Sequence, residues 1–213
     1  MSAPLATAVL LSGGGRTLEN LLALRARGEL PIAPRLVISS SARAFGLVRA
    51  ERAGIAARTL LRRGYADDAA YSQAVFGACR EAGAELVLLA GWLKLLRPIP
   101  EDFRGKVLNI HPALLPAFGG PGYYGERVHQ AALDRGVKVS GCTVHFVDDE
   151  YDHGPIVVQR AVPVREGDDA HALAARVFEA ECQAYPEAIR LYAAGRLRIE
   201  GGRVRIAPAP PEG

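Results

Sequence analysis

Short aliphatic runs alternate with amphipathic stretches through the first half of the chain. The runs that we expect to be strands are 6–11, 35–39, 57–60, 85–91 and 106–110. Patterns typical of helices follow the first three runs and begin near Arg16, Ala44 and Asp67. A strand, a helix and a further strand in this order form a βαβ unit, in which the two strands are parallel. Uninterrupted apolar runs suit strands that are covered on both faces. The pattern therefore predicts an α/β fold with a doubly wound, mostly parallel sheet.

The pattern changes after about residue 138, where two β-rich runs are joined by the acidic segment DDEYDH. No room is left there for a crossover helix, so an antiparallel C-terminal part of the sheet is predicted. A long helix is predicted from Asp169 to Ala194, followed by a hairpin that turns at Gly201 and Gly202. Without a repeat or a linker, we expect one domain over residues 1–206 and a flexible tail over 207–213.

Composition and charge narrow the class of protein. The 213 residues are 49% hydrophobic, which suffices for a large core, and the net charge of +3 is spread along the chain. This net charge is too small to indicate nucleic-acid binding, but it is compatible with a small anionic substrate. The three scattered cysteines favour a reducing compartment, and we expect a cytoplasmic protein without a leader or a membrane segment. Both a monomer and a homodimer fit these features.

The segment LLSGGGRTLENLL joins the first strand to the first helix. Its glycines let backbone amides approach an anion, and the start of a helix favours negative charge. Neither a dinucleotide fingerprint nor a P-loop is present, because Leu18 replaces the third glycine and no GK[ST] follows. A single phosphate is therefore the better ligand, and a tight turn without a ligand is the alternative.

The segment VLNIHPALLP brings Asn109 and His111 to the carboxyl end of a buried strand, where ligands collect in open α/β sheets. Alternation along the strand places both side chains on the same side. An amide can hold developing charge on an oxygen, and an imidazole can move a proton. This pair suits carbonyl chemistry, although a lone histidine at a strand end is more often structural.

The acidic bend in HFVDDEYDHGPIV holds Asp148, Asp149, Glu150, Asp152 and His153. Such a cluster is usually a solvated turn, but a bend can also aim one carboxylate into a cleft, where it would raise the pKa of a histidine. No metal is expected, because no spacing typical of metal ligands accompanies these acids.

Two further interpretations concern the rest of the chain. No G-x-S-x-G elbow or cysteine–histidine pair supports an enzyme nucleophile. The glycine-rich segment 118–126 reads as a mobile loop over an active site, and His129 on the following helix reads as a surface or core residue rather than a catalyst.

Taken together, the chain resembles the phosphoribosylglycinamide formyltransferase family over nearly its whole length. The resemblance lies in the order and spacing of SGGGRTLENL, LAGWLKLLRP, VLNIHPALLP and TVHFVDDEYDHGPIVVQ. It implies a formyltransferase-like fold and transfer of a formyl group from 10-formyltetrahydrofolate to the glycine amine of glycinamide ribonucleotide. Asn109, His111 and Asp152 match the family's catalytic residues, and Asp152 is expected to keep His111 charged near neutral pH.

The resemblance also implies the binding residues. Those that match the site of the ribonucleotide and its phosphate are Gly15, Arg16, Thr17 and Glu181. Those that match the folate site are Leu93, Lys94, Leu95, Leu96 and the shared Asn109. The acidic bend is expected to frame the pterin, while Arg62, Arg63 or Lys94 would hold the glutamate of the folate.

Three other functions resemble this one or share the scaffold. Methionyl-tRNA formyltransferase and formyltetrahydrofolate hydrolase look similar around the Asn-x-His-Pro motif, but each is expected to carry a further domain for which 213 residues leave no room. A non-catalytic sensor of nucleotide or folate is the third, since a doubly wound fold alone permits it. The complete trio of Asn109, His111 and Asp152 argues against a sensor, because binding alone needs no proton donor.

Overall fold

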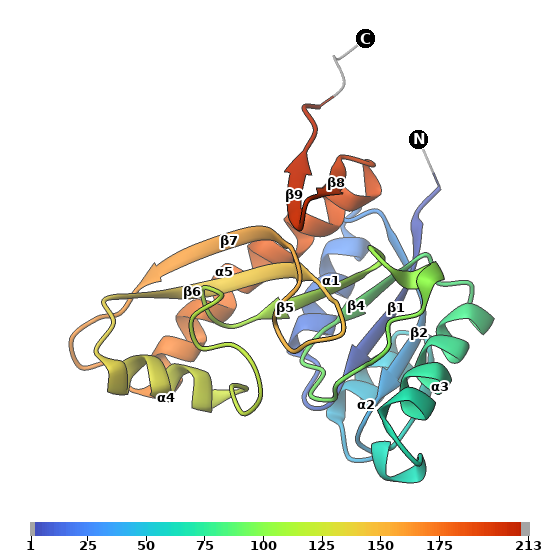
Figure 1. Cartoon of the computed structure of the whole chain (residues 1–213), viewed down its shortest axis with the longest axis horizontal. Helices are drawn as coiled ribbons and strands as arrows, with labels where there is room; N and C mark the ends of the chain where they lie inside the picture. The colour runs from blue at the N-terminus through green and yellow to red at the C-terminus, as the bar shows by residue number, and fades with distance from the viewer. Residues whose placement is uncertain (1–2, 210–213) are drawn as a thin grey trace.

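The computed structural model describes residues 3–209, which form a twisted seven-stranded sheet with helices on both faces (Figure 1). The strands lie in the order β3-β2-β1-β4-β5-β6-β7. Their bounds are β1 (Leu5–Leu11), β2 (Ile32–Ser39), β3 (Ala56–Thr59), β4 (Leu86–Leu89), β5 (Val107–His111), β6 (Val139–Phe146) and β7 (Ile156–Pro163). The strands from β3 to β5 are parallel, and β6 and β7 run antiparallel to their neighbours. The predicted fold class is confirmed.

Five α-helices and two short 3-10 helices connect these strands. They are α1 (Arg16–Ala26), α2 (Phe45–Arg52), α3 (Asp68–Glu81), α4 (Glu126–Arg135) and α5 (Ala170–Ala193), with 3-10 turns at Arg62–Gly64 and Glu101–Phe103. The predicted starts of α3 and α5 are correct to one residue because Asp67 and Asp169 are their N-caps. The two carboxylates accept hydrogen bonds from backbone amides in the first turn at 2.8 and 2.7 Å.

The core consists of two layers, one on each face of the sheet. Helices α1, α2, α4 and α5 pack with Val9 and Leu11 on one face. Helix α3 and the segment 92–103 pack with Ala8 and Leu10 on the other. Alternate residues of β1 therefore face different layers, which explains why the strand is apolar throughout.

Helix α5 is attached to the centre of the sheet by Tyr185. This side chain is fully buried, and its hydroxyl lies 3.0 and 2.9 Å from the carbonyl oxygens of Leu89 on β4 and Leu108 on β5. A buried phenol needs such a partner, because an unpaired hydroxyl in the core is costly. The contact holds α5 across the two strands that lead into the functional site.

A separate hairpin follows α5, as the sequence predicts. It consists of β8 (Leu197–Glu200) and β9 (Arg203–Ile206), which are antiparallel. The backbone N–H of Ala207 donates to the carbonyl of Arg196 at 2.8 Å, so pairing extends into the first residue of the predicted tail. The last four residues of that tail, 210–213, lie outside the described part of the chain.

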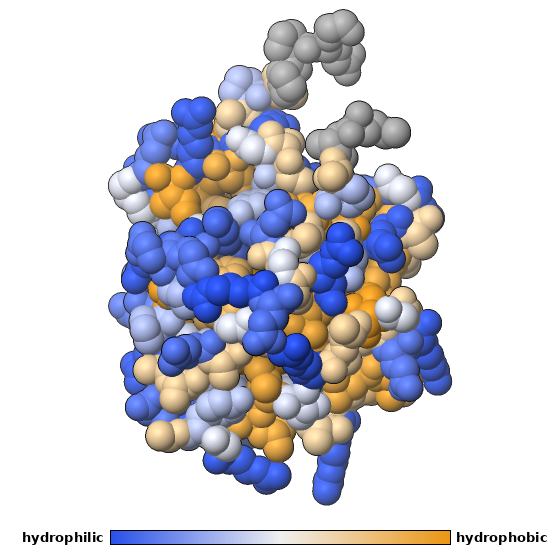
Figure 2. Space-filling model, turned by 90° about the vertical axis from the view of Figure 1, so that its right-hand side faces the viewer, coloured by the Kyte–Doolittle hydropathy of each residue, from blue (hydrophilic) through white to orange (hydrophobic). Residues whose placement is uncertain are grey.

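The surface of the side that carries α3 is mixed. Figure 2 shows hydrophilic side chains spread over this face, with apolar atoms visible between them. Within residues 3–209, none of the helices combines the length and apolar character that crossing a membrane requires.

The order of the strands determines where a ligand can bind. The chain leaves β1 toward β2 and β3 on one side and returns through β4 and β5 on the other. Connections that diverge in this way leave a crevice outside the carboxyl ends of the strands. The segments that follow β1, β4 and β5 meet at this point, and these are the segments that carry the predicted chemistry.

Candidate active site

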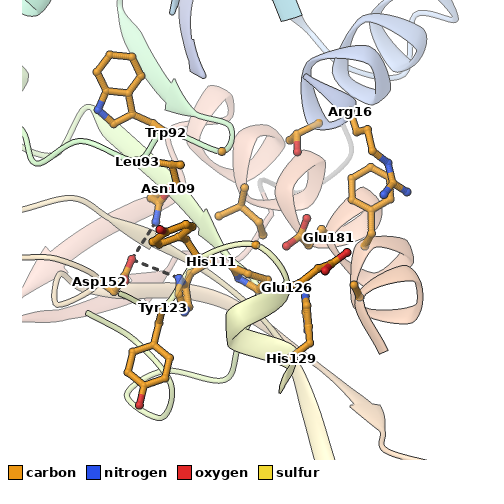
Figure 3. Close-up of a pocket in the computed structure, with 18 of the residues that line it drawn as sticks. Arg16, Trp92, Leu93, Asn109, His111, Tyr123, Glu126, His129, Asp152 and Glu181 are labelled. Carbon is orange, nitrogen blue, oxygen red and sulfur yellow. Dashed lines mark hydrogen bonds and ion pairs between the residues drawn. The ribbon is translucent and has the colours of Figure 1, made fainter. Parts of the chain in front are cut away.

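A cavity of about 610 Å³, called the main cavity below, opens at the carboxyl ends of β1, β4 and β5 (Figure 3). Its wall is completed by the glycine-rich segment 120–126 and by one side of α5. Asn109, His111 and Asp152 lie together on one side, while Arg16 and Glu181 lie on the other. The cavity therefore brings the catalytic and ribonucleotide groups predicted from sequence into one space.

The trio of Asn109, His111 and Asp152 comes from two distant segments. Asn109 and His111 lie on β5, and Asp152 lies in the bend between β6 and β7. The Asp152 Oδ1 atom is 3.3 Å from Asn109 Nδ2, which donates to it, and 3.5 Å from His111 Nδ1. One carboxylate oxygen thus faces both an amide and an imidazole.

The backbone around Asp152 has an unusual shape that aims this carboxylate into the cavity. Asp152 has a φ of 52°, in the left-handed region that aspartate tolerates better than most residues. Gly154 follows closely against β6, where a Cβ atom would lie 2.0 Å from the carbonyl oxygen of Phe146. Only glycine fits there, so the bend turns sharply and returns the carboxylate toward β5.

Two other acids of the bend, Asp148 and Asp149, make contacts that stabilise the bend and its packing. Asp149 accepts a hydrogen bond from the backbone of Ile99 at 2.6 Å, and Asp148 pairs with His153 at 2.7 Å. The usual interpretation of an acidic cluster as a structural turn therefore applies to Asp148 and Asp149. Asp152 is the member that faces the main cavity.

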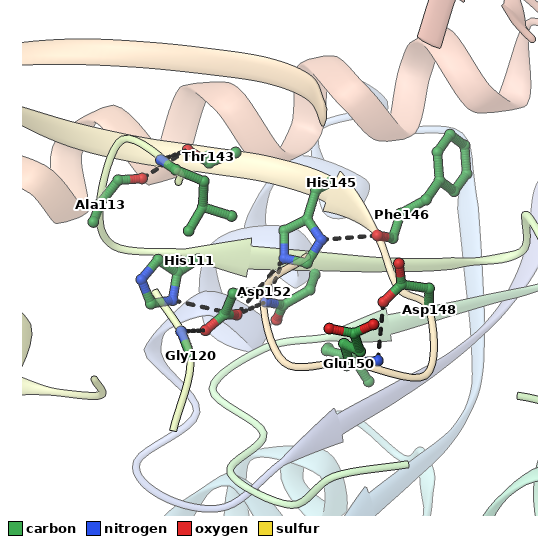
Figure 4. Close-up of polar contacts among 12 residues, drawn as sticks. His111, Ala113, Gly120, Thr143, His145, Phe146, Asp148, Glu150 and Asp152 are labelled. Carbon is green, nitrogen blue, oxygen red and sulfur yellow. Dashed lines mark hydrogen bonds and ion pairs between the residues drawn. The ribbon is translucent and has the colours of Figure 1, made fainter. Parts of the chain in front are cut away.

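The segment 118–120 lies at this end of the cavity and contacts two members of the trio. Figure 4 shows the contact between Gly120 and Asp152. His111 Nε2 donates to the carbonyl oxygen of Phe118 at 2.8 Å. The backbone N–H of Gly120 donates to Asp152 Oδ2 at 2.9 Å. The loop therefore supplies a hydrogen-bond partner to both His111 and Asp152.

Burial and charge oppose each other at His111 and Asp152. Burial lowers the pKa of His111, and this outweighs the raising effects of Asp152 and the Phe118 carbonyl. Burial alone would raise the pKa of Asp152, but the nearby His145 and His111 and the Gly120 amide together lower it. The sequence expectation that Asp152 keeps His111 charged near neutral pH is wrong for the free protein: the imidazole is 4% exposed, and desolvation dominates.

His145 belongs to this cluster and was missed in the sequence analysis. The antiparallel register of β5 and β6 places it opposite Asn109, and Asn109 Nδ2 donates to His145 Nε2 at 3.0 Å. The other ring nitrogen, Nδ1, donates to the carbonyl oxygen of Phe146 at 2.8 Å, which fixes the tautomer. The signal in the sequence was a histidine within an otherwise apolar strand, but only the register of the sheet reveals its partner.

At the opposite end of the cavity, Arg16 and Thr17 begin α1. Among the described residues no side chain caps this helix, so the N–H groups of its first turn can bind an anion. Gly15 precedes them with a φ of 72°, and a Cβ there would lie 2.7 Å from the Cα of Gly46. Gly15 itself is absent from the lining of the cavity, so it shapes the turn beneath Arg16 and Thr17.

Two side chains of α5 complete that end. The Arg16 guanidinium stacks over the ring of Phe178, with Cζ 3.9 Å from the ring centre, and no residue in 3–209 accepts a hydrogen bond from it. Burial raises the pKa of Glu181 to about 7, and Arg16 opposes this. Phe178 was not predicted, because nothing in its helical pattern distinguishes it from a core residue.

Of the predicted folate residues, only Leu93 and Asn109 line the main cavity. Leu93 lines the main cavity and is 43% exposed. Lys94, Leu95 and Leu96 are not part of the lining, and Leu96 is buried in the core layer beneath α3.

A second cavity of about 510 Å³ lies beside Arg62 and Arg97. Asp68 accepts a hydrogen bond from Arg62 at 2.8 Å, so this candidate for the folate glutamate already has a carboxylate partner. No cluster of three or more potential metal ligands occurs in the part of the chain that the structure describes.

The chain belongs to the formyl transferase family, whose sequence profile matches residues 5–189. It is 36% identical to the phosphoribosylglycinamide formyltransferase of Escherichia coli strain K12 over 208 residues, which cover 96% of each chain. It is also 41% identical to the trifunctional purine biosynthetic protein adenosine-3 of Gallus gallus over 199 residues, and spans 19% of that longer protein. The crystal structure of glycinamide ribonucleotide transformylase 1 from Symbiobacterium toebii superposes with a TM-score of 0.91 at 44% identity, covering 98% of this chain and 96% of that one.

Proposed function

We propose that this protein transfers the formyl group of 10-formyltetrahydrofolate to the amine of 5-phosphoribosylglycinamide in purine biosynthesis. The observation that carries the proposal is the main cavity itself. It has the trio of Asn109, His111 and Asp152 at one end, and at the other, beside a helix N-terminus, it has Arg16, which has no hydrogen-bond partner within residues 3–209. A substrate with a phosphate at one end and an amine at the other matches this separation. Two relatives support the same choice, since one is named phosphoribosylglycinamide formyltransferase and the other glycinamide ribonucleotide transformylase.

In the proposed complex, the phosphate binds the first turn of α1 with Arg16 and Thr17, and Glu181 contacts the ribonucleotide. The folate enters beside Leu93, and the acidic bend that carries Asp152 frames the pterin. No metal takes part in this scheme. A cytoplasmic location and a monomer or homodimer stay predictions from the sequence.

The reaction is a direct transfer. The neutral amine attacks the formyl carbon, a C–N bond forms, and the carbonyl π electrons move to oxygen. Asn109 N–H and His111 Nε2–H donate to this oxyanion, as preorganised donors do in other acyl transfers. The bond from carbon to N10 then breaks, and N10 takes up the proton that the attacking amine gives up.

This scheme requires two hydrogen bonds of the free protein to be exchanged. The Asn109 contact with Asp152 is long, at 3.3 Å, so its hydrogen is available to the formyl oxygen. The His111 hydrogen is held by the Phe118 carbonyl at 2.8 Å, and the formyl oxygen must take that place. The proton that the attacking amine gives up can pass through His111 on its way to N10, and Asp152 stabilises the imidazolium that forms in between.

The test is a spectrophotometric assay with purified protein, 10-formyltetrahydrofolate and 5-phosphoribosylglycinamide, with and without the ribonucleotide. We expect tetrahydrofolate to be released only when the ribonucleotide is present. Release without the ribonucleotide would instead indicate a hydrolase, and no release in either case would reject the proposal.

A further inference from the structure

The glycine-rich turn before α1 is held from outside by α2. Three successive glycines leave a backbone with many accessible conformations, so contacts from elsewhere must select one of them. The backbone N–H of Gly46 donates to the carbonyl oxygen of Gly13 at 3.1 Å. Arg49 Nε donates to the carbonyl oxygen of Gly14 at 3.0 Å. Two consecutive carbonyl groups of the turn are therefore fixed by one helix.

Arg49 also contacts α1 itself. Its Nη1 atom donates to a carboxylate oxygen of Glu19, which lies in the first turn of that helix. The Arg49 guanidinium lies over the ring of Phe45, with Cζ 5.0 Å from the ring centre, and the side chain is 21% exposed. One guanidinium, held by an aromatic ring, thus joins the turn before α1 to the first turn of α1.

The carboxylate of Glu19 opposes anion binding at this helix. A carboxylate in the first turn is attracted by the same positive helix end that would attract a phosphate, and it repels a phosphate bound there. Arg49 is the one basic residue within 3–209 that forms an ion pair with Glu19. This pairing brings the local charge close to zero, so the first-turn N–H groups and Arg16 can act on an anion without opposition from Glu19.

We propose that Arg49 is a positioning residue for the phosphate of the substrate. It fixes the glycine-rich turn through the Gly14 carbonyl, and it neutralises Glu19 in the first turn of α1. Arg49 is absent from the lining of the main cavity, so it does this without touching the ligand. The inference rests on the proposed function, in which a phosphate binds the first turn of α1.

The experiment measures the affinity for ribose 5-phosphate by calorimetry at low salt. The variants are Arg49→Met, which keeps an unbranched apolar stem without a charge or a donor, Glu19→Gln, and the double variant with both changes. Arg52→Met is the matched control, because Arg52 lies on the same helix with Cζ 5.8 Å from the ring of Phe45. Within residues 3–209 the Arg52 side chain forms no hydrogen bond or ion pair. Thermal unfolding of each variant separates a change in affinity from a loss of fold.

We expect Arg49→Met to weaken binding of ribose 5-phosphate about tenfold, because an unpaired Glu19 repels the phosphate and the turn loses one contact. Adding Glu19→Gln should recover about threefold of this loss, which is the share due to charge, and the remainder measures the fixing of the turn. Higher salt should reduce the share that Glu19→Gln recovers. Arg52→Met should stay within about twofold of the wild type, and Glu19→Gln alone should bind at least as tightly as the wild type.

If Arg49→Met does not fold, Arg49→Gln decides, because glutamine can still donate to the Gly14 carbonyl but carries no charge. Its affinity should fall about threefold and be restored by Glu19→Gln. Equal affinities of the Arg49 and Arg52 variants would overturn the inference. A double variant that recovers nothing would overturn it as well, and so would a wild type that does not bind ribose 5-phosphate.

The proposed function fails separately from this inference. A protein that binds ribose 5-phosphate with the expected dependence on Arg49 but transfers no formyl group would reject the function and keep the role of Arg49. A protein that transfers the formyl group, with an unchanged KM for the ribonucleotide in Arg49→Met, would reject only the role of Arg49.

Discussion

His145 accepts a hydrogen bond from the amide of Asn109 at 3.0 Å across the antiparallel pair of β5 and β6. Because its other nitrogen donates to the Phe146 carbonyl, the ring cannot turn freely, and Asn109 is held with its NH₂ group toward Asp152. His145 is a positioning residue in this arrangement. It sets the direction of an oxyanion donor without facing the main cavity.

Replacing His145 with phenylalanine should therefore lower kcat while KM for the ribonucleotide changes little. Asn109 would lose the acceptor that orients it, and misplacement of a reacting group by about 1 Å costs up to about a hundredfold in rate. Steady-state kinetics measure the effect, and His145→Gln should recover part of kcat. A uniform rise in KM in both variants would show that His145 acts on binding instead.

His111→Ala and Asp152→Ala should each reduce turnover by about two to three orders of magnitude, the usual cost of losing one stabilising group at an oxyanion. Circular dichroism and thermal unfolding should show an intact fold. Asp148→Ala is the comparison, since it removes an acid of the same bend that pairs with His153 rather than with His111. Near-normal activity in either purified trio variant would contradict the mechanism.

Arg16→Ala and Phe178→Leu should raise KM for the ribonucleotide about tenfold with kcat nearly unchanged, because in the proposed complex the guanidinium binds the phosphate and the ring of Phe178 holds the guanidinium in place. Both effects should weaken with salt. Arg25→Ala serves as control, since it removes a positive charge from the last turn of the same helix. Equal effects of the Arg16 and Arg25 variants on KM would show that Arg16 acts only through the overall positive charge of the protein and not by binding the phosphate directly.

Glu181 should make stability fall as pH rises. Its carboxyl titrates near 4.5 when unfolded and near 7 in the folded protein, because burial disfavours the charged form. The folded state therefore binds more protons between these values, and stability decreases across this window by at most about 3 kcal/mol. Urea unfolding of the unliganded protein from pH 4 to pH 8 should show this slope, and Glu181→Gln should lack it. Identical slopes would contradict the raised pKa.

Tyr185→Phe should lower the free energy of unfolding by about 1–2 kcal/mol, because the hydroxyl shared by the Leu89 and Leu108 carbonyls is lost. Chemical denaturation measures this change. Tyr65→Phe is the control, since the Tyr65 hydroxyl makes no hydrogen bond with the described residues. A similar loss in both variants would show that the Tyr185 contact contributes nothing specific.

The sequence predicts the sheet well because local rules decide it. Alternating runs and the caps Asp67 and Asp169 indicate where strands and helices begin, and the short acidic connection makes β6 and β7 antiparallel. Asn-x-His at a strand end also indicates Asn109 and His111 from the sequence alone, whereas Asp152 is selected from the acidic bend only by the resemblance.

Contacts between distant segments are what the sequence does not reveal. His145 meets Asn109 through strand register, Phe178 on α5 meets Arg16 on α1, and His129 lines the cavity from the helix that follows the glycine-rich loop. The prediction for the pKa of His111 is wrong for the same reason. A motif can indicate a neighbouring charge, but the degree of burial depends on the packing of the whole site.

Helix α5 connects the core with the main cavity within one turn. Glu181 lines the main cavity and Tyr185, four residues later and so on the same side of the helix, is bonded to β4 and β5. A change in packing beneath Tyr185 therefore also displaces the carboxyl of Glu181. Given the contact proposed between Glu181 and the ribonucleotide, variants selected for thermostability along this turn should also be screened for ribonucleotide affinity, and the reverse.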